Sequence, residues 1–324
     1  MIGCGSFARA SHGPAQVRCR AEMPGLELAA CCDVVERHAA DYARDFGYAR
    51  HYCDVEAMLT AEKPAAVVLA VPPSATCAAA SPVLERGLPL LLEKPPGLTT
   101  AELDRLEAAA QKGGAGAQVA FNRRYMPVLR KAREMLAGML LDANARVDYA
   151  MDRFDRWDAD FSTTAVHGLD AMLFLAGSPL AAAELRFQTV RQGPRETANV
   201  ILDGECVSGC RVSLSLRPVT AFNVESALVH ATGQALKISF AYPPSPNSEG
   251  TVEHWRANDL AGSYSDSECD VVEKLGVFAE TRAFLEAVRS GGGYNPTLAE
   301  CRQQVALMEA IRLRRTGVIR FAAS

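Results

Sequence analysis

The chain has 324 residues, a length that suits two domains better than one. Apolar residues make up 49% and charged residues 22%, which is typical of a globular protein, and the net charge of −4 gives no basic field for nucleic acid. The longest strongly apolar run, residues 65–71, is too short to cross a bilayer, and no secretory signal opens the chain. We therefore expect a cytoplasmic protein with no membrane or nucleic-acid partner.

The ten cysteines are scattered and form no CxxC pair. In a chain of this size they are expected to act as small apolar core residues in a reducing compartment. Cys206 and Cys210 have no nearby His or further Cys that would complete a zinc site. We expect no metal.

The N-terminal residues form a G-x-G-x-x-A turn. A stretch with helical character, residues 8–23, follows it, and then an apolar strand, residues 26–32, which ends in Asp33. This order of turn, helix, strand and acid is typical of a dinucleotide-binding βαβ unit, in which the helix N-terminus receives the pyrophosphate. The turn residues expected to bind the cofactor are Gly3, Gly5, Ser6, Phe7 and Ala8.

Asp33 is expected to accept hydrogen bonds from the adenosine ribose hydroxyls and to repel a 2′-phosphate. This favours NAD over NADP, although Arg37 is close enough in sequence to keep NADP open. The alternative reading of Asp33 is a plain turn residue at a strand end.

The first strand is a difficulty, because only Met1 and Ile2 precede Gly3, whereas a strand usually has roughly five residues. Either the true N-terminus lies upstream of Met1, which we favour, or the strand is stunted. A stunted strand is expected to weaken both the sheet and the cofactor site.

Strands and helices then alternate as far as residue 121, which predicts a doubly wound parallel sheet of the Rossmann type. Short strands are expected near residues 51–53, 65–71, 88–92 and 118–121, with helices between them. Asp54 is expected to cap one helix, and Thr99 with Glu102 to open the helix 101–112 as a capping box.

Two proline turns follow buried strands of this domain. Pro72 belongs to the first, at the sheet edge where the nicotinamide half of a cofactor would pass. Glu93, Lys94 and Pro95 form the second, where an X-Pro bond could be cis. The turn provides a stiff mount for a catalytic ammonium on Lys94, and Glu93 is expected to support the turn and the cofactor site.

The pattern changes after residue 121, and residues 122–324 are predicted to form an α+β domain with an open, largely antiparallel sheet. We expect a helix over 122–139, a strand over 145–154, an apolar helix over 161–176, and β-rich runs from 183 to 242. Residues 243–268 are expected to be a loop, 271–289 a helix, and 297–315 a last helix that packs back on the first domain.

The motifs, in this order and spacing, resemble those of the glucose–fructose oxidoreductase, inositol dehydrogenase and rhizopine catabolism (Gfo/Idh/MocA) family over nearly the whole chain. They are GCGSFA at 3–8, CDV at 32–34, VPPS at 71–74, EKP at 93–95, NRRYMP at 122–127 and HGLD at 167–170. The resemblance implies an NAD(P)-dependent oxidoreductase acting on sugars, polyols or their derivatives. It also implies a substrate site between two domains and a homo-oligomer, dimer or tetramer, through the second-domain sheet.

By this resemblance, Lys94 is the catalytic lysine and His167 the catalytic histidine. A histidine has a suitable pKa to remove the hydroxyl proton while hydride leaves the carbinol carbon, and a lysine ammonium stabilises the developing alkoxide. Without the family, His167 would be read as a helix-packing residue. The substrate-binding residues implied are Lys94, Arg124, Tyr125, His167 and Asp170.

Thr163 departs from the family pattern, because many members carry an acidic residue at this place, four residues before the histidine. Asp158 and Asp160 are candidate substitutes from the preceding loop. Arg123, Arg124 and Tyr125 either bind an anionic substrate group or serve as helix-end pairing.

Three functions stay open. The first is a dehydrogenase that turns over NAD(P). The second is a hydrolase or lyase that uses tightly held NAD for transient oxidation. The third is a non-catalytic protein that binds nucleotide or sugar.

Overall fold

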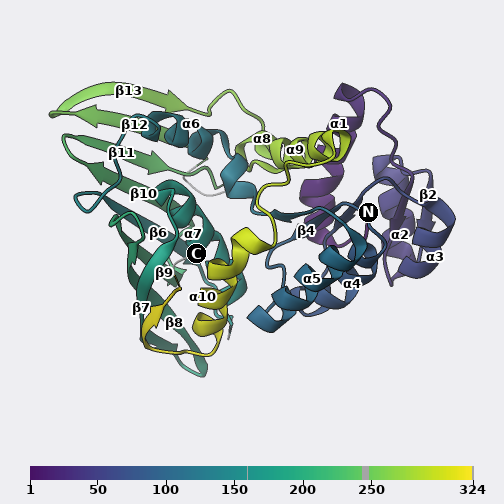
Figure 1. Ribbon diagram of the computed structural model, residues 1–324, viewed down its shortest axis with the longest axis horizontal. Helices are drawn as coiled ribbons and strands as arrows, with labels where there is room; N and C mark the ends of the chain where they lie inside the picture. Colours follow the sequence, from purple (N-terminus) through teal and green to yellow (C-terminus); the bar gives the residue numbers. More distant parts are fainter. Residues whose placement is uncertain (159, 243–247, 323–324) are drawn as a thin grey trace. The chain divides into compact units, whose positions relative to one another are not determined.

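The computed structural model describes residues 1–158, 160–242 and 248–322, and the chain forms two compact units. Unit 1 comprises Met1–Asn122 with Gly276–Val305, and unit 2 comprises Arg123–Leu275 with Ala306–Ser324. Figure 1 draws the ribbon of both units, coloured along the sequence.

Unit 1 is built on a parallel sheet, which confirms the predicted Rossmann fold. Two strands pair on one side and three on the other, and Ile2 joins the two groups by single bridges to Cys32 and Leu69. The spatial order is therefore β2, β1, Ile2, β3, β4, β5. The strands are β1 (Ala30–Cys32), β2 (Arg50–Tyr52), β3 (Val67–Leu69), β4 (Leu90–Glu93) and β5 (Ala117–Ala120).

Two helices of unit 1 begin at side-chain caps. Asp54 accepts a hydrogen bond from the Ala57 N–H, and Thr99 accepts one from the Glu102 N–H. The Glu102 carboxylate receives the Leu98 N–H at 2.6 Å, so the expected capping box closes one residue earlier than in the usual motif. The helices of unit 1 are α1 (Gly13–Glu22), α2 (Glu36–Phe46), α3 (Val55–Glu62), α4 (Pro73–Glu85), α5 (Thr100–Gly113) and α9 (Val277–Ser290).

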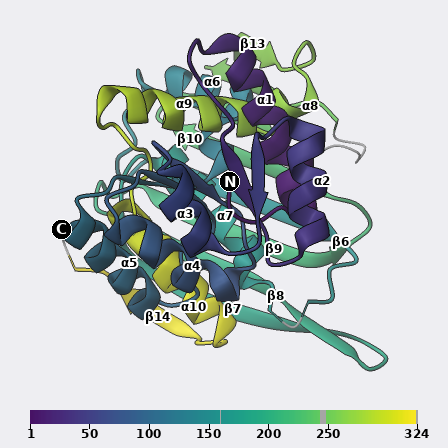
Figure 2. The ribbon, with the colours of Figure 1, turned by 90° about the vertical axis from the view of Figure 1, so that its right-hand side faces the viewer.

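Helix α9 comes from far along the chain and packs against α1. Its Phe284 is fully buried in one core cluster with Cys4, Cys31 and Leu91. Figure 2 shows α9 alongside α1 in this unit. The first residue of α10 (Arg302–Arg312) pairs with two carboxylates of α5, among them that of Asp104 at 2.8 Å. The core of unit 1 is therefore closed by a segment remote in sequence.

Unit 2 is dominated by a nine-stranded sheet in the order β13-β12-β11-β10-β6-β9-β8-β7-β14. All neighbours are antiparallel except β6 and β9, which confirms the open, largely antiparallel sheet. The strands are β6 (Arg146–Phe154), β7 (Leu180–Gln192), β8 (Arg195–Cys206), β9 (Arg211–Thr220), β10 (Val224–Ala231), β11 (Gln234–Ser239), β12 (Thr251–Arg256), β13 (Asp259–Ser265) and β14 (Gly317–Arg320).

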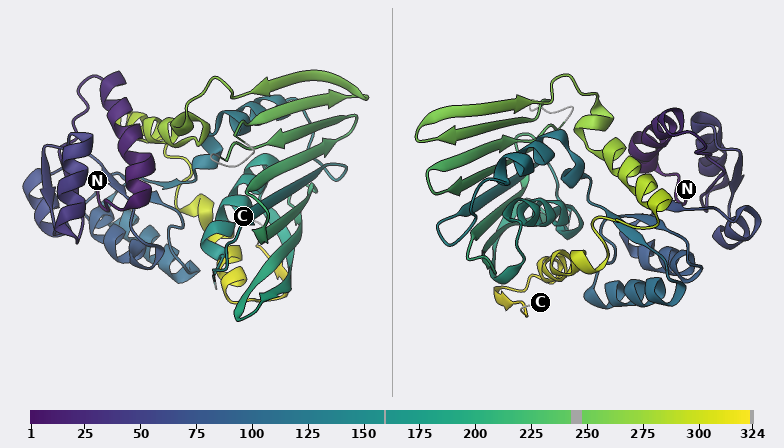
Figure 3. Two further views of the ribbon diagram at one scale, coloured as in Figure 1. Left: turned by 180° about the vertical axis from the view of Figure 1, so that it is seen from behind. Right: turned by 45° about the horizontal axis from the view of Figure 1, so that its top comes forward.

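One face of this sheet carries two helices, α6 (Pro127–Leu136) and α7 (Ser162–Ala176), as Figure 3 shows. Burial alternates along β6, so that Val147, Tyr149, Met151 and Arg153 face this core. The period of two is the one expected for a sheet covered on one side.

The prediction of a loop over residues 243–268 is wrong for the described part of that segment. Residues 251–265 form the hairpin β12–β13, whose turn residues Ala257 and Asn258 have φ of 46° and 73°. Such a turn suits the twist of a hairpin. Residues 243–247 lie outside the described part of the chain.

Three predicted helices are interrupted. The stretch 8–23 begins as a π-helix over Ala8–His12 before α1. Residues 122–125 form a 3₁₀ turn, and α6 starts at Pro127, a residue that suits a first helical position. The stretch 271–289 divides at Gly276, whose φ of 75° a helix cannot contain.

Candidate active site

The glycine turn of unit 1 follows Ile2 directly and leads into the helical stretch from Ala8. Gly3 has φ of 86°, and a Cβ there would lie 2.2 Å from the Ala70 carbonyl oxygen, so only glycine fits. A Cβ on Gly5 would meet nothing within 4 Å among the described residues. The space beside Gly5, at a helix N-terminus, is what a pyrophosphate requires.

Asp33 directly follows β1 and is hydrogen-bonded to the glycine turn. Its carboxylate accepts the Cys4 N–H at 2.8 Å and the Val35 N–H at 2.9 Å, and its side chain is 12% exposed. A carboxylate has about four acceptor positions, so these two bonds leave room for ribose hydroxyls. Arg37 is 88% exposed in its side chain and lies 3.5 Å from Asp41. The residues present therefore fit the adenosine ribose of a dinucleotide.

The carboxyl ends of β1, β3 and β4 meet at one edge because the strands are parallel. This edge carries Asp33, then exposed Pro72, which precedes α4, and then Glu93 and half-buried Lys94. The Lys94–Pro95 peptide is cis, as the sequence allowed. The unit thus brings the predicted cofactor residues and Lys94 to the same edge.

His12 contacts the predicted site residue Glu93, and the sequence reasoning did not single it out. Its Nε2 lies 2.8 Å from Glu93 Oε1, and its side chain is only 1% exposed. The contact joins the helix after the glycine turn to the end of β4. No pattern around His12 pairs it with a residue 81 positions away.

His167 lies on α7 in unit 2 and is half-buried. The next residue, Gly168, faces the sheet, where a Cβ would come within 3.2–3.3 Å of side-chain atoms of Met151, Leu214 and Leu216. Glycine therefore lets α7 lie close to β6 and β9. Thr163 and Asp170 stand four residues before and three after His167, on the same helix face.

Arg124 and Asp170 form an ion pair in unit 2. Arg124 Nε donates to Oδ2 at 2.9 Å and the Nη2 group donates to Oδ1 at 2.6 Å, with the Asp170 side chain fully buried. This pairing attaches the 3₁₀ turn, with half-buried Tyr125, to the helix that carries His167. It supports the helix-end role for Arg124 and a supporting role for Asp170.

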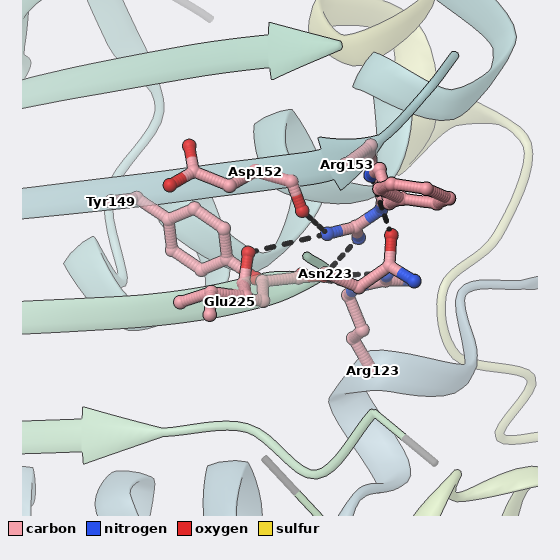
Figure 4. Close-up of polar contacts among 8 residues, drawn as sticks. Arg123, Tyr149, Asp152, Arg153, Asn223 and Glu225 are labelled. Carbon is pink, nitrogen blue, oxygen red and sulfur yellow. Dashed lines mark hydrogen bonds and ion pairs between the residues drawn. The ribbon is translucent and has the colours of Figure 1, made fainter. Parts of the chain in front are cut away.

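Arg123 enters a buried cluster with Tyr149, Arg153 and Glu225 (Figure 4). Its Nη2 donates to Glu225 Oε2 at 2.8 Å, while the Arg153 guanidinium and the Tyr149 hydroxyl donate to the same carboxylate. Burial alone would raise the pKa of Glu225, but the two guanidiniums hold that pKa at about 2. Arg123 is thus an anchor of unit 2.

The two acids before α7 have other partners. Asp158 pairs with Arg156 at 2.7 Å, and Asp160 accepts the Ser162 N–H at 2.9 Å at the helix start. Both contacts favour local structural roles for Asp158 and Asp160. They do not support either residue as a substitute for the acid that is missing at Thr163. Ala159 lies outside the described residues.

Within the described residues, no three His, Cys, Asp or Glu side chains are grouped so that they could hold a metal ion. The ten cysteines, all of them described, form no disulfide. In the described part of the chain, no helix has both the length and the apolar character needed to cross a membrane.

Comparison with known proteins agrees with this arrangement. Residues 1–121 match the model of the Gfo/Idh/MocA oxidoreductase family, NAD-binding Rossmann fold. A D-apiose dehydrogenase of Paraburkholderia graminis is 26% identical over 250 residues, which are 70% of this chain but less than two thirds, 64%, of that protein. The rhizopine catabolism protein MocA of Rhizobium meliloti is 25% identical over 236 residues, 67% of this chain and 70% of that protein.

The fold extends this agreement to the whole chain. A levoglucosan dehydrogenase, solved with NADH and levoglucosan, superimposes with a TM-score of 0.80 at 19% identity and covers 99% of this chain and 98% of its own. Residues 1–121 thus form an NAD-binding Rossmann domain of the Gfo/Idh/MocA oxidoreductase family, and the fold of the whole chain is that of the superimposed dehydrogenase.

Proposed function

We propose that the protein is an NAD-dependent dehydrogenase that oxidises a carbinol carbon of a sugar, a polyol or a related compound. The observation that carries this proposal is the convergence of the glycine turn, Asp33 and Lys94 at one edge of the parallel sheet in unit 1. Relatives named as dehydrogenases of D-apiose and levoglucosan support the substrate class.

In this proposal the glycine turn and the helix after it bind the pyrophosphate, and Asp33 binds the adenosine ribose. Bound NAD would supply the hydride acceptor. Lys94 donates a hydrogen bond to the substrate oxygen and stabilises its developing negative charge. His167 removes the hydroxyl proton, and Arg124 and Asp170 hold the start of unit 2 against its helix.

Asp33 also underlies the proposed preference for NAD over NADP. Its charge lies where a 2′-phosphate would bring a second negative charge, and the nearby Arg37 side chain is directed to solvent and Asp41. Two negative charges held close together repel each other, which would weaken the binding of NADP.

The test compares Lys94→Ala with Lys112→Ala, which removes an exposed lysine paired with Glu85 on neighbouring helices. We expect Lys94→Ala to lose turnover by about a hundredfold or more while NAD affinity persists, and Lys112→Ala to behave as the unaltered protein. Turnover is followed as NADH formation over a panel of sugars, polyols and sugar acids. Substantial activity in Lys94→Ala would refute the role, and NAD binding without redox activity on any substrate would refute the function.

We also propose that copies of the chain associate through the face of the unit 2 sheet opposite α6 and α7. This face carries small and polar residues such as Ala150, Ser213 and Ser226, which allow close approach of a second sheet. Sedimentation would test this, with Ser213→Arg and Ser226→Arg expected to shift the protein to monomers. A monomer in the unaltered protein would refute it.

A further inference from the structure

His12 links two parts of unit 1, the glycine turn and the end of β4. It closes the π-helical turn Ala8–His12, directly after the glycine turn. The next residue, Gly13, lies against the Phe46 ring, where a Cβ would be 2.5 Å from the nearest ring atom. A π-helical turn changes which side chains face the sheet, and such turns are frequent at functional sites. Here the turn directs the buried imidazole to Glu93.

The contacts of the imidazole come from both parts. The Phe7 ring meets it edge-on, with ring centroids 5.7 Å apart and planes at 78°. On the other side, Nε2 lies 2.8 Å from Glu93 Oε1. Phe7 belongs to the proposed cofactor turn, and Glu93 is the last residue of β4, directly before Lys94.

The hydrogen-bond pattern indicates which nitrogen carries the proton. Nδ1 is buried and has no partner among the described residues. A proton on Nδ1 would leave a buried donor unsatisfied, which is more costly than an unused acceptor lone pair. Of the two tautomers with a single ring proton, the one protonated on Nε2 therefore fits best, with Nε2–H donating to the carboxylate.

We propose that His12 is a positioning residue for the reaction. Its contact holds the Glu93 carboxylate next to the helical stretch that leads into α1. Because Glu93 is the last residue of β4, this fixes the backbone directly before Lys94. Because the same ring touches Phe7, the glycine turn and the lysine are held as one rigid piece. Preorganised placement of a charged group matters most in the transition state, so the effect falls on kcat. This inference rests on the proposed function.

The experiment compares two variants that differ in one hydrogen bond. His12→Phe keeps an aromatic ring but removes the donor, and His12→Gln places an amide N–H near the position of Nε2. We expect His12→Phe to lower kcat about tenfold to a hundredfold, with the NAD Kd and the substrate KM changed less than threefold. His12→Gln should recover most of this loss.

Coupling to Glu93 gives a second readout. If His12 acts through Glu93, the variants His12→Phe and Glu93→Ala should be non-additive, so that the double variant loses little more kcat than the worse single variant. Independent, multiplying losses would overturn the proposal, as would a His12→Gln variant no better than His12→Phe.

Two further results distinguish positioning by His12 from a purely structural role and from catalysis by Lys94. Equal losses of NAD affinity, kcat and melting temperature in His12→Phe would indicate a structural role and overturn the positioning role. Full activity of His12→Phe, alongside an inactive Lys94→Ala, would refute the positioning role and leave the proposed function standing. An active Lys94→Ala would instead refute the catalytic assignment of the lysine on which both depend.

Discussion

Replacing Glu225 by Gln should strongly destabilise unit 2, because it removes the one carboxylate that Arg123 and Arg153 share in the buried cluster of described residues. Glu225 lies opposite Met151 in the β10–β6 pairing, so Tyr149 and Arg153 are its diagonal neighbours on the buried face. Gln has nearly the same shape as Glu and keeps one acceptor oxygen. The change therefore tests the charge, with little disturbance of packing.

The expected loss follows from the pKa. A carboxyl whose pKa falls from 4.5 to about 2 on folding contributes about 3 kcal/mol to the free energy of unfolding. The same order, about 3–5 kcal/mol, is typical when one partner of a buried ion pair is removed. Since the folded pKa is depressed, this contribution is fully present above pH 4.5 and is lost as the pH falls towards 2.

The measurement is urea unfolding from pH 7 down to pH 3, with hydrogen exchange of the β6 and β10 amides as a probe specific to unit 2. The matched control is Glu196→Gln, because Glu196 pairs with Arg191 on the β7–β8 hairpin with both side chains half or more exposed. The control should lose about 0.5 kcal/mol or less. A loss in Glu225→Gln below about 1 kcal/mol, or one that does not shrink at low pH, would refute the reasoning.

Three further predictions concern single positions. Gly3→Ala should unfold or severely destabilise unit 1, because its Cβ would lie 2.2 Å from a carbonyl oxygen. Gly5→Ala should instead keep the melting temperature of the unaltered protein and lose NAD affinity in a titration. Equal melting temperatures of the two variants would contradict this. Asp33→Asn should reduce the ratio of NAD to NADP affinity by about tenfold in the same titration, and an unchanged ratio would remove the basis for the cofactor preference. Burial raises the pKa of Asp266, so its ionised form costs stability above pH 3.8. Asp266→Asn should therefore raise the melting temperature at pH 7, and this gain should vanish below pH 3.8. A gain that persists at the lower pH would be inconsistent with this reasoning.

The sequence predicted the parts of the fold that local physics determines. Asp54 and Thr99 cap the helices they were expected to cap, and Gly177, with φ of 64°, ends α7 where predicted. The apolar runs at residues 65–71 and 88–92 contain the buried parallel strands β3 and β4. A strand that is covered on both faces is apolar at successive positions, so this pattern could be recognised in the sequence. The same signals brought Asp33 and Lys94 to one sheet edge.

What the sequence could not predict depends on contacts between distant residues. The hairpin β12–β13 was missed because β12 buries only one apolar side chain, that of Val252, and because most residues of β13 are exposed. Arg123 and Glu225 stand 102 positions apart, and no local pattern identifies which acid a buried arginine will meet. The pairing of His12 with Glu93 was missed for the same reason.

The first strand shows why a weak local signal can still give a well-formed site. Ile2 donates to the Val68 carbonyl at 2.8 Å and accepts the Ala70 N–H at 2.8 Å. Gly3 in turn donates to the Cys32 carbonyl at 2.8 Å, so the turn is held from both neighbouring strands.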